Sequence, residues 1–490
     1  MTDHFDMIIV GAGVSGIGAA VHMRDKCPSK SICILESREA AGGTWDLFRY
    51  PGIRSDSDMH TFGYKFKPWV NAKSIADGPS ILSYLSETID EHDLRKDIRF
   101  GHKVIAAHWS TPDALWRVET QSGQKLTCNF LFMCAGYYSY EEPHNPELAG
   151  EKNFKGEVVH PQHWRDDIEY KDKRVVIIGS GATAVTLLPS MAQDAAHVTM
   201  LQRSPTYIAA QPGKDRIANF LRAIMPNKWA YALTRYKNEL FQSYIYKASM
   251  KNPEKIKQLL LDKVQKELGD DWNIDPDFIP SYFPWEQRLC LSPDGDFFEA
   301  LRSGKASVTT DHIEQITETG ITLKSGKTLP CDLIVKATGI NVVTMGQSAF
   351  TVDGEPVDFS KKFTYEAMMY SDVPNMASVF GYINASWTLR ADLIAEYVCR
   401  IVNHMDAKSL RQATPRAPEG MEGHPWLTIF DPGYIKRVLP EMPMQGDRDP
   451  WLNEQNYRRD KKVLPSKPID DGHMIFSNPT AAPKISEAAE

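Results

Sequence analysis

Two short glycine-rich segments have the residue types and spacing of sites that hold a dinucleotide. Gly11-Ala12-Gly13-Val14-Ser15-Gly16 has the pattern Gly-x-Gly-x-x-Gly, and Gly179-Ser180-Gly181-Ala182-Thr183-Ala184 has the same pattern with alanine in the last place. Glycines at these positions permit a tight turn, close approach of the backbone to a pyrophosphate, and close packing of helix on strand. The anion is then expected at the N-terminus of the following helix, where unpaired N–H groups and the helix dipole favour negative charge.

The residues at the end of the next strand differ in charge between the two motifs. Glu36 follows Gly16 by 20 residues, and a carboxylate there accepts hydrogen bonds from ribose hydroxyls but repels a 2′-phosphate. The first site is therefore predicted to hold FAD or NAD. The second motif is followed by Gln202 and Arg203 with no acid, and a guanidinium suits a phosphate, so this site is predicted to prefer NADPH.

Two dinucleotide sites in one chain imply that a hydride passes between two cofactors. A flavin must hold the hydride between the two half-reactions, so the first site is predicted to be that of FAD. Flavin disulfide reductases carry a redox cysteine pair just after a Gly-Gly-Thr segment, whereas here Gly42-Gly43-Thr44 is followed by Trp45. The seven cysteines are scattered and form no Cys-x-x-Cys pair, so we expect buried thiols and neither disulfides nor a metal site.

The elements that must position these motifs follow a repeated strand–glycine–helix order. We expect an α/β fold with two Rossmann-like dinucleotide-binding domains, separated in the sequence by 168 residues. The predicted strands are 6–10, 31–35, 103–107, 115–119, 130–133, 174–178, 197–201 and 333–335, with helices from the two turns to about 26 and 192. Residues 37–77 are predicted to be rich in loops, and the tail from about 465 to be an extended arm or partly disordered.

Residues 214–268 differ from the rest in being helical by composition, basic and rich in aromatic side chains. We expect this segment to form a lid and substrate wall, while contact with a membrane surface stays open as an alternative. No run approaches the roughly 18 apolar residues that span a bilayer, and no signal peptide is visible, so a cytoplasmic location is expected. The net charge of −7 argues against nucleic acid as a partner, and the sequence does not decide the oligomeric state.

Two longer motifs resemble those of type I Baeyer–Villiger monooxygenases. Gly43-Thr44-Trp45 is followed by Tyr50-Pro51-Gly52 and Asp56, and Phe154-Lys155-Gly156 is followed by His160 and Trp164 between the nucleotide motifs. Arg165 replaces the usual proline or aspartate after that tryptophan. The stretches 45–56 and 384–388 look like the ethionamide-activating monooxygenase subgroup, and the resemblance covers nearly the whole chain.

The resemblance implies a discontinuous FAD domain at 1–139 and 337–490. The NADP domain is then 140–336, with a helical insertion at about 214–280. The residues expected to bind FAD are Gly11, Gly13, Ser15, Gly16, Glu36, Thr44, Trp45, Asp46, Leu47, Asp56 and Val104. The residues expected to bind NADP are Arg54, Ser55, Asp56, Gly179, Ser180, Gly181, Ala182, Thr183, Ala184, Val185, Gln202 and Arg203.

In this family NADPH reduces FAD, O2 adds at the flavin C4a to give a peroxide, and the peroxide attacks a ketone to yield an ester or lactone. Sulfides are expected as further substrates. The family's active-site arginine falls on Arg288, whose fixed charge would stabilise developing negative charge, with Asp56 as its partner. His160 and Trp164 are expected to tie the interdomain linker, and Trp387 either lines the nicotinamide pocket or packs in the core.

Other activities remain open on the same scaffold. The main alternative is oxygenation of nitrogen or sulfur in soft nucleophiles. An oxidase that releases hydrogen peroxide is a second, and a non-enzymatic NADP-responsive binding protein is a third that two complete nucleotide motifs disfavour.

Overall fold

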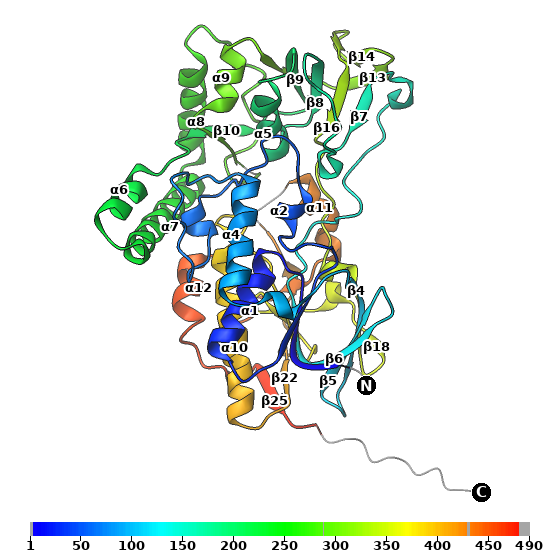
Figure 1. The fold of residues 1–490 in the computed structure, drawn as a ribbon, viewed down its shortest axis with the longest axis vertical. Helices are drawn as coiled ribbons and strands as arrows, with labels where there is room; N and C mark the ends of the chain where they lie inside the picture. The colour runs from blue at the N-terminus through cyan, green and yellow to red at the C-terminus, as the bar shows by residue number, and fades with distance from the viewer. Residues whose placement is uncertain (1–2, 288, 429–431, 480–490) are drawn as a thin grey trace, which may run out of the picture.

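The computed structural model describes residues 3–287, 289–428 and 432–479, arranged as two β-sheets one above the other along the long axis (Figure 1). Both sheets contain parallel strands followed by helices, which confirms the predicted α/β class with two Rossmann-like units. The strand–glycine–helix units begin with β1 (Asp3–Val10) and β8 (Arg174–Ile178), near the residues expected from the sequence.

In the first sheet β1 lies between β6 and β2, and its residues Met7, Ile8 and Ile9 are fully buried because both faces of the strand are covered. Its strand order is β18-β17-β4-β5-β6-β1-β2-β3, and β21 also pairs with β6. The bounds of the other strands are β2 (Ile32–Leu35), β3 (Ile98–Arg99), β4 (Val104–Ser110), β5 (Leu115–Thr120), β6 (Lys125–Met133), β17 (Ala349–Val352), β18 (Glu355–Pro356) and β21 (Met376–Ser378).

Three long helices cover one face of this sheet: α1 (Val14–Lys26), α4 (Gly78–Glu91) and α10 (Trp387–Ala407). Because α10 lies against α1, the C-terminal part of the chain completes the unit that the N-terminal part begins. On the other face, Trp109 and Trp116 from β4 and β5 fill a separate core. Packing on both faces fixes the orientation of the first glycine turn.

The second sheet is parallel throughout and has the order β12-β9-β8-β16-β7. Its strands besides β8 are β7 (Glu157–Val159), β9 (His197–Gln202), β12 (Ala306–Thr310) and β16 (Leu333–Lys336). The helices α5 (Ala182–Met191) and α9 (Asp296–Arg302) pack against each other beside it. Small side sheets are formed by β10 (Tyr207–Gln211) with β11 (Leu289–Pro293), and by β13 (Ile313–Thr317), β14 (Gly320–Leu323) and β15 (Thr328–Pro330).

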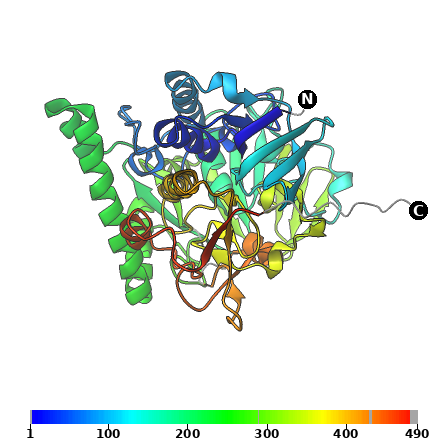
Figure 2. The same ribbon diagram turned by 90° about the horizontal axis from the view of Figure 1, so that it is seen from below.

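The basic aromatic segment folds as three helices, as predicted, and they stand at the edge of the molecule in both views (Figures 1 and 2). They are α6 (Arg216–Ile224), α7 (Asn227–Lys251) and α8 (Pro253–Leu268). Asp215 caps α6 by accepting a hydrogen bond from the Ala218 N–H at 2.9 Å, and Asn227 follows Pro226 at the start of α7.

The tail forms an ordered strand as far as Ser477, although a partly disordered arm was one of two expectations. β25 (Met474–Ser477) pairs antiparallel with β22 (Gln412–Pro415), and residues 480–490 lie outside the described residues. The loop-rich stretch contains only the short helices α2 (Thr44–Leu47) and α3 (Met59–Phe62). The remaining elements are α11 (Gly433–Val438), α12 (Tyr457–Val463), β19 (Thr364–Tyr365), β20 (Met369–Tyr370), β23 (His424–Pro425) and β24 (Met444–Gln445).

Within the described parts of the chain, no helix is long and apolar enough to cross a lipid bilayer.

Candidate active site

The first glycine turn leaves no room for side chains where a dinucleotide backbone would pass. Gly11 has a φ of +104°, and a Cβ there would lie 2.6 Å from the Cys134 carbonyl oxygen. A Cβ on Gly16 would lie 1.8 Å from the Gly11 carbonyl oxygen. Both glycines are therefore required by the turn itself, which brings the end of β1 against the end of β6.

The second glycine turn repeats this arrangement in the other sheet. Gly179 has a φ of +136°, and a Cβ there would lie 2.3 Å from the Ala337 carbonyl oxygen at the end of β16. Ala184 is fully buried in place of the last glycine, so its methyl group fits where the first turn requires none. The two motifs are thus equivalent in structure as well as in sequence.

The N-terminus of α1 and the side chain of Glu36 form the wall where the first cofactor is expected. Gly13 caps α1 without a side-chain hydrogen bond, which leaves backbone N–H groups of the first turn available for an anion. The buried Glu36 carboxylate accepts hydrogen bonds from the Ala12 N–H at 2.7 Å and the Arg38 N–H at 2.9 Å. These bonds hold the carboxylate at the cavity with further lone pairs free for ribose hydroxyls.

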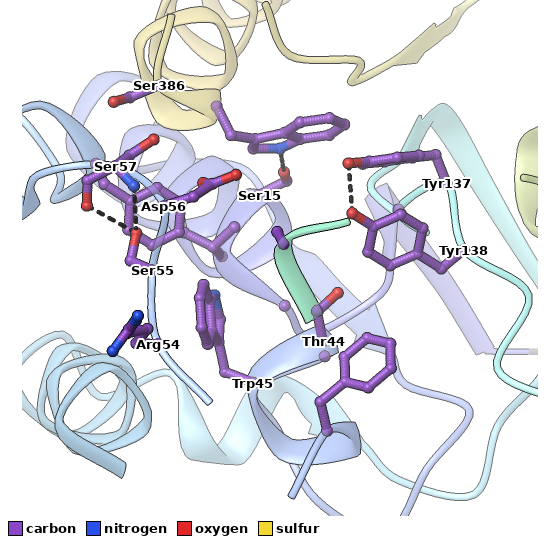
Figure 3. A pocket seen from close by; sticks show the side chains of 18 of the residues that line it. Ser15, Thr44, Trp45, Arg54, Ser55, Asp56, Ser57, Tyr137, Tyr138 and Ser386 are labelled. Carbon is purple, nitrogen blue, oxygen red and sulfur yellow. Dashed lines mark hydrogen bonds between the residues drawn. The ribbon is translucent and has the colours of Figure 1, made fainter. Parts of the chain in front are cut away.

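One cavity of about 1190 Å³ connects the two nucleotide turns. Its wall includes Ser15 of the first turn, Thr183 of the second, and Phe241 of α7. This volume exceeds that of most pockets for one small ligand, which fits a site for two cofactors and a substrate. Figure 3 shows Thr44, Trp45, Arg54 and Asp56 gathered around this cavity with Tyr137 and Tyr138.

The segment 43–56 connects the two sheets. Gly43 approaches the first turn so closely that a Cβ would lie 3.1 Å from the Gly13 Cα. Gly52 has a φ of +77°, and a Cβ there would lie 2.8 Å from the Ser190 Cβ of α5. Arg54 forms an ion pair with Asp296 of α9, its second contact measuring 3.3 Å. The sequence motif therefore joins the FAD-type turn to the second nucleotide unit.

Tyr50 belongs to the same contact between units. It packs in the core of the second sheet, and burial raises the pKa of its hydroxyl to about 12, a rise that a hydrogen bond to Thr183 opposes. The phenol therefore stays protonated at neutral pH and acts as an uncharged donor or acceptor beside the second glycine turn.

Many of the residues expected to bind cofactor line the cavity. They are Gly11, Gly13, Ser15, Glu36, Thr44, Trp45, Arg54, Ser55, Asp56, Val104, Ala182 and Thr183. Asp56 lines it between Arg54 and Asp58, and Arg288, the expected catalytic cation, lies outside the described residues. The catalytic pairing of Arg288 with Asp56 therefore stays a prediction.

Other expected cofactor residues lie away from the cavity wall, and their roles also stay predictions. They are Gly16, Asp46, Leu47, Gly179, Ser180, Gly181, Ala184, Val185, Gln202 and Arg203. The Asp46 carboxylate is engaged by Arg38 at 2.5 Å and Arg49 at 3.0 Å. The buried Gln202 amide donates to the Asp277 carbonyl and the Thr310 hydroxyl, whereas Arg203 is exposed.

Comparison with known proteins places this site in a family. Residues 8–244 match the model of the pyridine nucleotide-disulphide oxidoreductase family. The FAD-containing monooxygenase EthA of Mycobacterium tuberculosis is 50% identical over 444 residues, which are 90% of this chain and 91% of that protein. The Probable FAD-binding monooxygenase AlmA of Acinetobacter baylyi is 50% identical over 424 residues, covering 86% and 85% of the two chains. The chain belongs to the FAD-containing monooxygenase family.

The solved structures of similar shape confirm the fold of this monooxygenase. A steroid monooxygenase bound to NADP superposes with a TM-score of 0.74 at 23% identity, over 85% of this chain and 88% of that one. A cyclohexanone monooxygenase superposes with a TM-score of 0.69 at 20% identity, over 85% and 91%. The family and the flavin monooxygenase class predicted from the sequence, with FAD as cofactor, are confirmed, and the use of NADPH stays a prediction.

Trp387 of the monooxygenase is part of the cavity wall and also packs on its neighbours. Its indole N–H donates to the Ser15 hydroxyl at 2.8 Å, and its ring stacks on Tyr137 with centroids 4.9 Å apart. The Tyr137 and Tyr138 hydroxyls are hydrogen-bonded at 2.6 Å (Figure 3). Trp387 thus lines the cavity and packs against the core, and its place beside the nicotinamide stays a prediction.

A buried polar network that the sequence did not predict fixes α7 to the FAD unit. Arg235 of α7 donates to the His60, Thr61 and Gly63 carbonyl oxygens at 3.0, 3.3 and 2.8 Å, at the C-terminal end of α3. Its guanidinium also lies 3.7 Å from Asp392 of α10 and 3.6 Å from Glu239. In sequence Arg235 is one of many basic residues, and no local signal sets it apart.

Asp58 fixes the next turn of α7 in the same way. Its carboxylate caps α3 and accepts hydrogen bonds from the Asn238 and Gln242 amides at 2.8 and 3.0 Å. Burial opposes ionisation, but the hydrogen bonds from His60, Thr61 and Asn238 outweigh it and hold the pKa of Asp58 below its ordinary value. The cavity wall formed by α7 is therefore set by charged groups of the FAD unit.

His160 and Trp164 lie in the segment that crosses between the units and make structural contacts. The His160 Nδ1 accepts a hydrogen bond from the Gln162 N–H at 3.2 Å, and the Gln162 amide donates to the Ser139 carbonyl at 2.8 Å. Burial lowers the pKa of His160 to about 4, and the nearby His163 adds to this effect. His160 is therefore neutral at pH 7, while Trp164 packs against the core of the second sheet.

All seven cysteines are buried, as predicted. Burial raises the pKa of Cys33 to about 11 and that of Cys331 to about 12, so these thiols are inert at neutral pH.

Proposed function

We propose that this protein is a Baeyer–Villiger monooxygenase that uses NADPH and O2 to insert one oxygen atom into ketones, giving esters or lactones, and that also oxidises sulfides. The observation that supports this most is the single cavity joining an FAD-type turn, an NADP-type turn and the Trp45–Asp56 segment typical of that class. FAD, when bound and reduced by NADPH, would supply the activation of O2.

The residues that would hold FAD fit that cofactor on structural grounds. The open N-terminus of α1 suits the pyrophosphate, and the buried Glu36 carboxylate suits the ribose. The crowded contact of Gly13 with Gly43 leaves backbone alone beside the cofactor path. Ser15 and Trp387 would complete this wall through their mutual hydrogen bond.

NADPH would lie over the second turn, with Arg203 as the group that selects the 2′-phosphate. Its side chain is exposed at the end of β9, so it can reach a ligand on the surface of the second sheet. Arg54 and Tyr50 would orient this coenzyme, since both contact the second nucleotide unit and border the cavity. We place the NADP domain at 140–336 and the discontinuous FAD domain at 1–139 and 337–490.

Arg288 and Asp56 would carry the substrate chemistry. When a ketone carbonyl is attacked, negative charge develops on its oxygen, and a fixed guanidinium in a site that excludes water stabilises that charge by about 3 kcal/mol. Asp56 borders the cavity and would hold this guanidinium in place. The aromatic and aliphatic wall of α7 and α8 would exclude water and receive an apolar substrate.

Product analysis with isotopically labelled oxygen tests this function. A linear methyl ketone is incubated with the holoenzyme, NADPH and 18O2, and the products are analysed by mass spectrometry. We expect an ester that carries one 18O atom. NADPH consumption with hydrogen peroxide as the only product would instead identify an oxidase.

A further inference from the structure

The face of α6 and α7 that points away from the molecule is apolar, and none of the described residues covers it. Of the fifteen large apolar side chains that are exposed in the described residues, ten lie between 217 and 259. On α6 they recur at Ile217, Phe220 and Ile224, and on α7 at Trp229, Leu233, Tyr236 and Tyr244. These spacings of three, four and eight residues place each set on one side of its helix.

The exposed side chains of these two helices form an apolar stripe. We define it as Phe220, Ile224, Trp229, Leu233, Tyr236 and Tyr244. Trp229 is 64% exposed and Tyr244 is 69% exposed. Contiguous exposed apolar surface of this kind marks a site of interaction with a protein or membrane. Figures 1 and 2 show that the green helices bearing the stripe project at the edge of the molecule, where a flat partner can reach them.

The charges around the stripe distinguish between these partners. Residues 214–251 contain eight lysines and arginines and two acids, in a chain whose net charge is −7. Both acids are already paired, Asp215 with Lys237 at 2.6 Å and Glu239 with Lys461 at 2.7 Å. The exposed Arg216, Lys228, Lys247 and Lys251 therefore leave this face strongly cationic.

We propose that the α6–α7 face is a membrane-binding surface that lies in the headgroup region of an anionic lipid bilayer. Tryptophan and tyrosine favour that region because each combines an apolar ring with a polar atom, and flanking lysines attract anionic lipids. A second copy of this chain fits less well, because a symmetric contact would bring two cationic stripes together. The stripe is too short and too polar to span the bilayer, so the contact is peripheral.

The rim of the cavity borders the stripe, because Ile217 and Phe241 precede the stripe residues Phe220 and Tyr244 by three positions each. Ile217 of α6, Phe241 of α7 and Leu259 of α8 line the cavity and are also about half exposed, so they form its rim. A bilayer in contact with the stripe would therefore adjoin this rim. The site is thus placed to take a long-chain, lipid-dissolved ketone directly from the membrane; this second statement rests on the proposed function, whereas membrane binding does not.

Vesicle sedimentation of the full-length holoenzyme tests the binding surface. We expect the protein to sediment with phosphatidylglycerol-containing vesicles, and to bind pure phosphatidylcholine vesicles and anionic vesicles in high salt at least tenfold more weakly. The triple variant Trp229→Ser, Tyr236→Ser, Tyr244→Ser should lose at least tenfold in binding. These three side chains are exposed and do not line the cavity, so folding and FAD content should not change.

Matched controls separate this surface from apolarity or charge in general. Ile105→Ser with Ile475→Ser removes two exposed apolar side chains from the FAD unit and should leave binding unchanged. Lys247→Glu with Lys251→Glu should weaken binding at least tenfold, whereas Lys305→Glu with Lys324→Glu should not. Absence of binding to anionic vesicles, or equal binding by the triple variant, overturns the proposal. So does a wild-type dimer that the triple variant converts to a monomer without any vesicle binding.

An activity assay distinguishes this proposal from the function on which its second part rests. The triple variant should oxidise a short water-soluble ketone at the parent rate and a long-chain ketone in vesicles at least fivefold more slowly. Equal loss on both ketones contradicts delivery from the membrane. If the parent protein oxygenates neither ketone but still binds vesicles, the Baeyer–Villiger function fails and the membrane surface stands.

Discussion

Replacing Glu36 by alanine tests how the first nucleotide site recognises its cofactor. The substitution removes the acceptor of the Ala12 and Arg38 backbone N–H groups, which lie 2.7 and 2.9 Å from its two oxygens. Hydrogen bonds to a charged group contribute about 1.5–3 kcal/mol each, and a buried donor left unpaired costs a further 1–3 kcal/mol. If the proposed ribose contact is lost as well, FAD binding should weaken by about 3 kcal/mol, or roughly 100-fold.

The assay is titration of the apoprotein with FAD, followed by the quenching of flavin fluorescence. Glu36→Gln is the matched control, because one amide oxygen can replace only one of the two acceptors, and it should fall between the parent and the alanine variant. The unfolding midpoint of the apoproteins shows how much of the loss comes from the fold. FAD binding by Glu36→Ala as tight as that of the parent would refute the assignment of this site.

Three further variants follow from the structure. Arg203→Ala should raise the KM for NADPH at least tenfold and leave NADH kinetics unchanged, because only NADPH carries the 2′-phosphate; equal loss with both contradicts the assignment. Arg235→Met should lower the free energy of unfolding by urea by about 3–5 kcal/mol, with Arg235→Lys intermediate, because it leaves a buried carboxylate and three carbonyl oxygens without their partner. A loss below about 1 kcal/mol would show that water replaces the guanidinium. The pKa of His160 is about 4 in the folded protein and about 6.5 in the unfolded chain. This group therefore leaves the free energy of unfolding unchanged above about pH 6.5 and lowers it as the pH falls from about 6.5 toward 4. Urea unfolding of His160→Gln should therefore show about 1 kcal/mol less destabilisation than the parent between pH 7.5 and pH 5, and identical pH profiles would contradict this account.

The parts of the fold that the sequence predicted well depend on local signals. Buried runs such as 7–10 and 175–178 consist of apolar residues alone, and each leads directly into a glycine turn. The predicted α1 ends at Lys26 as expected, and α5 ends one residue before the expected Ala192. The order of strand, turn and helix is enough to predict where both glycine turns lie in the fold.

The parts that the sequence did not predict depend on contacts between distant residues. β25 was expected as an extended or disordered arm, because its partner β22 lies about 60 residues earlier and no turn joins them. Arg235 is buried because the carbonyl groups at the end of α3 face it across the interface, and α3 lies about 170 residues away. In the sequence Gly52 has the features of an ordinary turn glycine, and its need for a missing side chain becomes clear only from the contact with Ser190 of α5.

Competition between a linear methyl ketone and an aryl methyl sulfide across pH tests the central claim most directly. A ketone carbon requires an anionic oxygen nucleophile, whereas a sulfide lone pair attacks a protonated oxygen donor, and the Arg288 cation should favour the anion. With both products quantified, we predict that ester dominates at neutral to mildly alkaline pH and that sulfoxide gains as the pH falls. Sulfoxide without ester at any pH would contradict the Baeyer–Villiger function and identify a heteroatom oxygenase.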